Sequence, residues 1–131
     1  MMNISELMIG NIVQYVSNKN EMSVQTDVAF RIGAIDKFGN IKRIPVDGPT
    51  VEYKIGEYAP IEITEDWLYR CGFFMCDYKK YKCGVFVYDL QTKLFTVHGY
   101  LFTMDKNLHK YVHQLQNACF ILSGELLTVK L

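Results

Sequence analysis

His109 and His113 lie one helical turn apart, a spacing that lets two imidazoles hold one ligand together. Gln116 and Phe120 continue the same stripe of the predicted helix, at about 100° per residue. We interpret the four residues as a recognition or ligand surface beside the apolar face of that helix. The alternative is structural, because half-buried polar side chains usually hydrogen-bond to neighbouring elements, and His113 and Gln116 then lock the helix in place.

The cysteines do not follow a metal-binding pattern. Cys71, Cys76 and Cys83 are separated by four and six residues, and the sequence has no Cys-x-x-Cys pair. It has no His-Glu-x-x-His either, and Cys119 belongs to the apolar face of the last predicted helix. We therefore expect ordinary free thiols, with no metal and no cofactor.

Patterns typical of enzymes are missing as well. The sequence contains no Gly-x-Ser-x-Gly elbow and no phosphate-binding glycine loop. Glu65 and Asp66 are adjacent, so on a helix they point to different sides and suit its N-terminus better than acid–base catalysis. Cysteines and histidines are present, but no spacing selects one pair as nucleophile and base. We predict a binding module and not an enzyme, with an unrecognised catalytic site as the competing hypothesis.

A second candidate surface interleaves aromatic and basic residues at the tip of a predicted hairpin. Lysines neutralise phosphates and tyrosines stack on bases, so single-stranded nucleic acid is the alternative partner to a protein. The structural interpretation is a solvated hairpin whose lysines discourage edge-to-edge aggregation. The residues of this surface are Tyr78, Lys79, Lys80, Tyr81 and Lys82.

The overall charge restricts the class of protein. In 131 residues, 14 lysines and arginines balance 14 aspartates and glutamates, which disfavours a protein whose main task is to grip a polyanion. No apolar run approaches the length that crosses a bilayer, and the first residues lack a basic segment before an apolar one. We expect a cytoplasmic protein with no membrane partner, and no pattern indicates its oligomeric state.

Residues 1–60 combine turn residues with short alternating segments. The turn signals are Gly10-Asn11 and Phe38-Gly39-Asn40. Short strands at this spacing are typical of a small barrel or a strongly curved sheet, and we predict an SH3-like barrel. The predicted strands are Ile12–Val16, Phe30–Asp36, Ile41–Ile44 and Val51–Ile55.

Residues 61–131 predict a helix, an antiparallel meander and a second helix. The first helix has Thr64 as N-cap, Ile63 and Leu68 at hydrophobic-staple spacing, and Gly72 to end it in a left-handed conformation. The second helix begins at Leu108, with Asn107 or Asp105 as cap. The predicted strands are Phe73–Tyr78, Val85–Tyr88, Lys93–Val97 and Tyr100–Met104, with a turn over Lys79–Gly84.

The last helix has one apolar face that we expect to lie on the meander. Its burial contributes roughly 1.5–3 kcal/mol for each large side chain. The fold class is therefore α+β, with an SH3-like barrel or curved sheet packed on a meander flanked by two helices, as one folding unit. The residues of the apolar face are Leu108, Tyr111, Val112, Leu115, Ala118, Cys119 and Leu122.

Three segments also resemble a known family. Tyr111-Val-His-Gln-Leu-Gln-Asn117, the following Phe120 and Ser123-Gly-Glu125 match its closing helix, and Thr64-Glu-Asp-Trp-Leu68 with Gly72-Phe73 matches its signature, with Asp66 and Ile63 as departures. The opening Leu7-x-Ile-Gly-Asn-x-Val13 is also similar. The family consists of short uncharacterised proteins of gut Bacteroidetes, their phages and mobile elements. The resemblance implies a phage or mobile-element accessory protein that contacts a host partner, and it indicates no chemistry.

Overall fold

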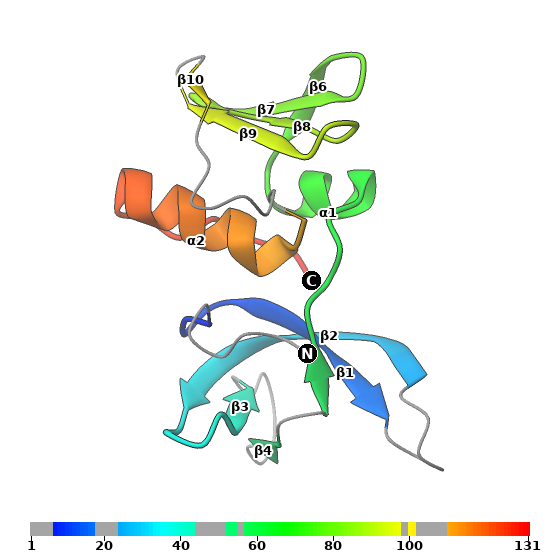
Figure 1. Ribbon diagram of the computed structural model, residues 1–131, viewed down its shortest axis with the longest axis vertical. Helices are drawn as coiled ribbons and strands as arrows, with labels where there is room; N and C mark the ends of the chain where they lie inside the picture. The colour runs from blue at the N-terminus through cyan, green and yellow to red at the C-terminus, as the bar shows by residue number, and fades with distance from the viewer. Residues whose placement is uncertain (1–6, 18–23, 44–51, 55–56, 98–99, 102–109) are drawn as a thin grey trace. The chain divides into compact units, whose positions relative to one another are not determined.

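The computed structural model describes residues 7–17, 24–43, 52–54, 57–97, 100–101 and 110–131. Within these residues the chain is a mixed α+β protein with ten strands and two helices (Figure 1). It divides into two compact units, Met1–Ile61 and Glu62–Leu131, and each is described by itself. The sequence analysis placed the division after residue 60, and folding as a single unit stays a prediction.

The first unit contains a curled, half-barrel sheet with the strand order β4-β3-β2-β1-β5 over the described ranges. Neighbouring strands are antiparallel throughout. The register shifts between Gln14 and Val16 and between Ile32 and Ala34, and such bulges increase the twist that curls a sheet. The strands are β1 Ile12–Ser17, β2 Val24–Ile35, β3 Ile41–Arg43, β4 Glu52–Tyr53 and β5 Tyr58–Ala59.

One buried apolar cluster holds this sheet together. The rings of Phe30 and Tyr53 stack with centroids 4.3 Å apart. The Tyr58 hydroxyl donates a 2.6 Å hydrogen bond to the carbonyl of Gly39, which ties β5 to the predicted turn before β3. Strands were predicted in all of the regions that form β1 to β4, whereas β5 was not predicted and β2 begins earlier, at Val24. The cluster comprises Leu7, Val13, Phe30, Ile32, Ile41, Tyr53 and Tyr58.

The second unit contains an antiparallel sheet with the order β10-β9-β8-β7-β6 over the residues that are described, so the predicted meander is confirmed. In Figure 1 the chain leaves α1 and enters β6 directly. The elements are α1 Glu65–Arg70, β6 Phe74–Asp77, β7 Lys80–Cys83, β8 Phe86–Asp89, β9 Leu94–Val97, β10 Tyr100–Leu101 and α2 Val112–Ser123.

One strand of the meander lies where the sequence predicted a turn. β7 occupies Lys80–Cys83, so the predicted turn over Lys79–Gly84 is wrong, and the chain reverses at Tyr78 and Lys79 instead. Lys79 takes the left-handed conformation, with φ of 57°. Tyr81 is fully buried while the lysines on either side of it are exposed, which is the alternation of a half-buried strand. The lysines masked this alternation in the sequence.

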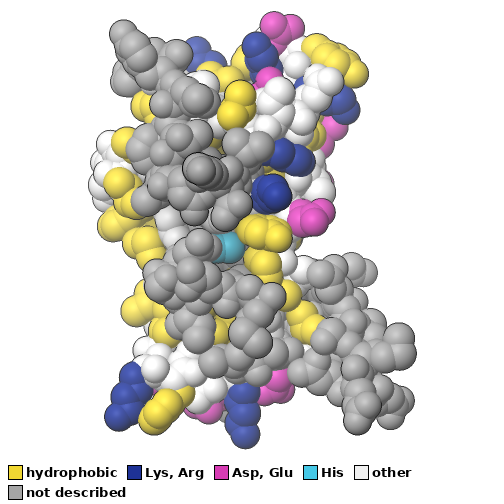
Figure 2. Space-filling view, viewed as in Figure 1, with side chains coloured by type: hydrophobic (Ala, Val, Ile, Leu, Met, Phe, Trp, Pro, Cys, Tyr) yellow, Lys and Arg dark blue, Asp and Glu magenta, His cyan; other side chains and the backbone are white. Residues whose placement is uncertain are grey.

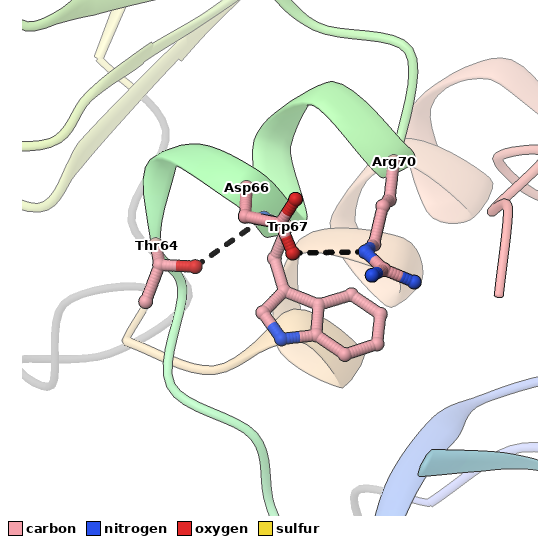
Figure 3. Close-up of polar contacts among 4 residues, drawn as sticks. All are labelled: Thr64, Asp66, Trp67 and Arg70. Carbon is pink, nitrogen blue, oxygen red and sulfur yellow. Dashed lines mark hydrogen bonds and ion pairs between the residues drawn. The ribbon is translucent and has the colours of Figure 1, made fainter. Parts of the chain in front are cut away.

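The start of α1 follows its prediction. The N–H of Trp67 donates to the hydroxyl of Thr64 at 3.3 Å, as expected for an N-cap (Figure 3). On the next turn, Nε of Arg70 donates to the Asp66 carboxylate at 2.9 Å, and the guanidinium lies 5.1 Å from the centre of the Trp67 ring. The Asp66 side chain is largely exposed and that of Arg70 partly so, and such a pair contributes less than about 1 kcal/mol.

The end of α1 is the predicted Schellman arrangement. Gly72 has φ of 88°, and its N–H donates to the carbonyl of Tyr69 at 3.0 Å. The N–H of Phe73 donates to the carbonyl of Leu68 at 2.9 Å. Leu68 and Phe73 are both fully buried. The sequence alone therefore specified both ends of this helix.

The second helix begins later than predicted. Lys110 is not helical, and Tyr111 is extended and forms an isolated bridge with Glu62, so the helix starts at Val112 and not at Leu108. The side-chain oxygen of Gln114 accepts from the N–H groups of Lys110 and Tyr111 at 2.9 and 3.1 Å, which satisfies two donors at this end. The predicted caps Asn107 and Asp105, like Leu108, lie outside the described residues.

The apolar face of α2 is confirmed over most of its length. Val112, Leu115, Ala118 and Cys119 have no exposed area. Leu122 is 40% exposed, so its predicted burial is wrong: the buried residues of α2 end at Cys119, and its last turn is exposed. In the described residues, neither helix has the length and apolar composition that a membrane crossing requires.

Gly72→Ala is expected to lower the free energy of unfolding by roughly 1–2 kcal/mol, because a Cβ is disfavoured at positive φ. The nearest atom to the added Cβ is Sγ of Cys83 at 3.9 Å, an ordinary contact, so backbone strain is the sole cost. Urea denaturation measures the change. Gly72→Asn is the control, because asparagine tolerates this conformation better, and equal losses for both variants would contradict the explanation.

Candidate interaction surface

The histidine surface predicted on the last helix is not a free edge. His113 and Gln116 are each 1% exposed, so neither lies on an accessible recognition or ligand surface. The buried arc of α2 is wider than the predicted apolar stripe and includes them. The His113 ring stacks on the ring of Tyr111 with centroids 5.9 Å apart. This burial favours the structural interpretation, while Phe120 is half-buried and His109 lies outside the described residues.

The aromatic and basic segment is divided between surface and core. Tyr78 is 75% exposed, and Nζ of Lys79 lies 5.8 Å from the centre of its ring. Tyr81 is fully buried and meets the Tyr69 ring edge-on, with centroids 5.9 Å apart. A buried ring cannot stack on a base, so the prediction that Tyr81 contacts nucleic acid is wrong. The strand alternation of β7 is the cause.

The sheet of the second unit has one buried face. Tyr81, Tyr88 and Phe95 lie directly opposite one another on β7, β8 and β9, and all three are fully buried. We call their side of the sheet the inner face and the opposite side the outer face. Lys80 and Lys82 flank Tyr81, so both lie on the outer face and both are exposed.

The two outer-face lysines have different neighbours. Lys80 lies opposite Asp77 on β6 and Asp89 on β8, so carboxylates balance its charge. Lys82 lies opposite Phe74 on β6 and Val87 on β8. Lys82 is therefore a cation in an apolar row, next to the edge of the sheet.

The sequence predicted a strand over Phe73–Tyr78, but of its exposed side chains only Tyr78 was singled out as a site residue. Of the strands that the structure describes, β6 is the last on its side of the sheet, and all four of its residues are exposed. Phe74 is 67% exposed and Met75 is 51% exposed. The Tyr69 ring, 40% exposed, lies 6.3 Å from the Phe74 ring. One signal was available, because two adjacent phenylalanines in a strand, Phe73 and Phe74, must point to opposite sides.

We define the β6 edge surface as Tyr69, Phe74, Met75 and Tyr78. On the face of the second unit that Figure 2 shows, basic, acidic and hydrophobic side chains lie side by side. The hydroxyl of Tyr69 donates to the Glu65 carboxylate at 3.0 Å, and this bond raises the pKa of Tyr69. Exposed apolar groups at the edge of a sheet are typical of contact sites.

The four cysteines differ in their exposure to solvent. Cys71 and Cys119 are buried, Cys83 is half-buried and Cys76 is exposed. Burial, followed by the influence of Cys83, raises the pKa of both buried thiols to about 12. Over the described part of the chain, no three His, Cys, Asp or Glu side chains are grouped so that they could hold a metal ion.

Comparison with known proteins adds no assignment: no family model, no curated protein and no solved structure matches this chain.

Alkaline pH is expected to destabilise the fold through the buried thiols. Their pKa rises from 9.0 to about 12 on folding, so their stabilising effect is complete below pH 9 and is lost as pH rises towards 12. At pH 10 each buried thiol is expected to lower the free energy of unfolding by roughly 1 kcal/mol. Urea denaturation at pH 8 and pH 10 measures it. Cys119→Ala should reduce this pH-dependent loss and Cys76→Ala should leave it unchanged. An unchanged loss in Cys119→Ala would contradict the assignment.

His113→Ala is expected to lower the free energy of unfolding by about 1–3 kcal/mol, because it removes a buried polar side chain from its packing. Thermal unfolding followed by circular dichroism measures the loss. Lys130→Ala, at an exposed position, is the control and should change stability little. A His113→Ala protein of unchanged stability that loses a binding partner would restore the recognition hypothesis.

Proposed function

We propose that this protein is a non-enzymatic interaction module that binds a partner protein through the β6 edge surface. The observation that carries the proposal is the exposure of Phe74 and Met75 on the last described strand of the sheet. Contact with a partner removes apolar area from water, and each Å² that is removed stabilises the complex by about 25 cal/mol. It also offers hydrogen bonds to the backbone groups of an edge strand.

The hairpin of β6 and β7 is suited to binding because buried side chains on its inner face hold it in place. Tyr81 anchors β7 in the core through Tyr88. Phe73, immediately before β6, is fully buried. Exposed side chains on such a support lose little conformational freedom when a partner binds.

The proposal includes three finer points that rest on the sequence. The curled half-barrel of the first unit is of the SH3-like kind, as its short antiparallel strands and bulges suggest. The two helices flank the meander. The protein is a cytoplasmic accessory protein of a phage or mobile element, as the resemblance of its closing helix implies. These points support an interaction role, since small barrels frequently bind peptides.

Single-stranded nucleic acid is the second candidate partner, and one arrangement favours it. Two exposed rings each have a lysine beside them: Phe74 lies opposite Lys82, and Tyr78 lies under Lys79. A ring that stacks on a base with a cation near the phosphate is the usual unit of such binding. The loss of Tyr81 from the predicted surface leaves this alternative with fewer stacking groups.

Phe74→Ser is expected to abolish partner capture from a lysate of host cells that also express the untagged chain, while nuclease treatment leaves capture intact. The serine removes a ring that is 67% exposed, so the fold should be preserved. Phe38→Ser is the matched control, because Phe38 is also 67% exposed but lies in the turn of the first unit. Affinity capture with quantitative mass spectrometry of the wild type and both variants provides the comparison.

Two outcomes of this experiment would contradict the proposal. Equal capture by wild type and Phe74→Ser would exclude the β6 edge surface as the contact. If nuclease abolishes capture, the β6 edge surface binds nucleic acid and not a protein. A titration with labelled single-stranded DNA at low salt then tests this binding directly. Lys82→Ala is expected to weaken the binding and to reduce its salt dependence.

A further inference from the structure

We propose that the partner of the β6 edge is β6 of a second copy of this chain, paired antiparallel about a two-fold axis. This inference rests on the proposed function, because it names the occupant of the same surface. The two sheets would join into one continuous sheet, with the axis between Met75 and Cys76. Phe74 of each copy would then lie opposite Asp77 of the other.

The register of β6 permits this pairing. Residues that oppose each other across an antiparallel pair must share a face of the sheet. Phe74 lies opposite Lys82 and Asp77 lies opposite Lys80, so both are on the outer face, although they are three positions apart. The register shift between Met75 and Asp77 produces this agreement. Without the bulge, Phe74 and Asp77 would point to opposite sides and the symmetric pairing would be mismatched.

Charge complementarity selects a second copy as the occupant. Lys82 is the cation of an apolar row that ends at Phe74. In the proposed pair, the next residue in that row is the Asp77 of the second copy. Lys82 and that carboxylate lie two strands apart, roughly 10 Å between Cα atoms, within reach of the two side chains across Phe74. Because the pair has two-fold symmetry, it contains this interaction twice. A formal net charge of zero adds no long-range repulsion between the copies.

Cys76 offers a native probe of the pairing. It is the one exposed cysteine of the described residues, and it is adjacent to the proposed axis. In this register the two Cys76 Cα atoms lie roughly 6 Å apart, within the range of a disulfide. Diamide, which takes up the two thiol hydrogens as the disulfide forms, should therefore convert the native protein into a covalent dimer. Cys76→Ser should form no covalent dimer under the same oxidation, although its reversible dimerisation should persist.

The decisive test is sedimentation of the intact chain from micromolar to millimolar concentration, without oxidant. We expect a reversible monomer–dimer equilibrium. Lys82→Glu should raise the dimer dissociation constant about tenfold, because it replaces two attractions by repulsions. Asp77→Lys should do the same, and the double variant Asp77→Lys/Lys82→Glu should recover most of the loss. Phe74→Ser should weaken the dimer by at least about a hundredfold, and Phe38→Ser should not change it.

The outcomes separate this inference from the proposed function. A wild type that stays monomeric at all concentrations would overturn the second copy as partner, while Phe74-dependent lysate capture would still support the β6 edge surface. A dimer that Phe74→Ser leaves intact, or a double variant no better than either single one, would also overturn the inference. Failure of both dimerisation and Phe74-dependent capture would remove the surface altogether.

Discussion

The C-terminal end of α1 determines on which face of the sheet each side chain of β6 lies. Gly72 turns the chain with positive φ, and the N–H of Phe73 donates to the carbonyl of Leu68 at 2.9 Å. Phe73 is thereby held in the core, and the alternation of a strand then directs Phe74 outward. A shift of one residue at this point would reverse the faces of β6 and bury Phe74 in place of Phe73. The exposed edge is a consequence of how the helix ends.

The buried row of β7 to β9 makes that edge a stable platform. Tyr81, Tyr88 and Phe95 have no exposed area, so the meander is anchored by three aromatic rings in line. β6 lies beside this row and has no described strand on its other side. Its short length and its bulge limit uncontrolled edge-to-edge association, and they leave room for one defined pairing.

The elements specified by local chemistry were predictable, and those decided by packing were not. Thr64 and Gly72 fixed α1 because caps act within a few residues. β7 was read as a turn because Lys80 and Lys82 resemble loop residues, and the burial of Tyr81 between them depends on strands that follow in the sequence. His113 and Gln116 were assigned to a recognition surface beside the apolar face because helical periodicity gives directions but not the width of the buried arc. Of the candidate surface only Tyr78 was among the predicted site residues, because only the order of strands shows that β6 is at an edge.

Amide hydrogen exchange of β6 tests the central claim most directly. At low protein concentration, the amides of Phe74–Asp77 that do not point to β7 should exchange much faster than those of β8, which has described neighbours on both sides. Their exchange should slow as concentration rises, while the exchange of β8 stays constant. Protection of all four β6 amides equal to that of β8 at every concentration would contradict an open edge at this strand.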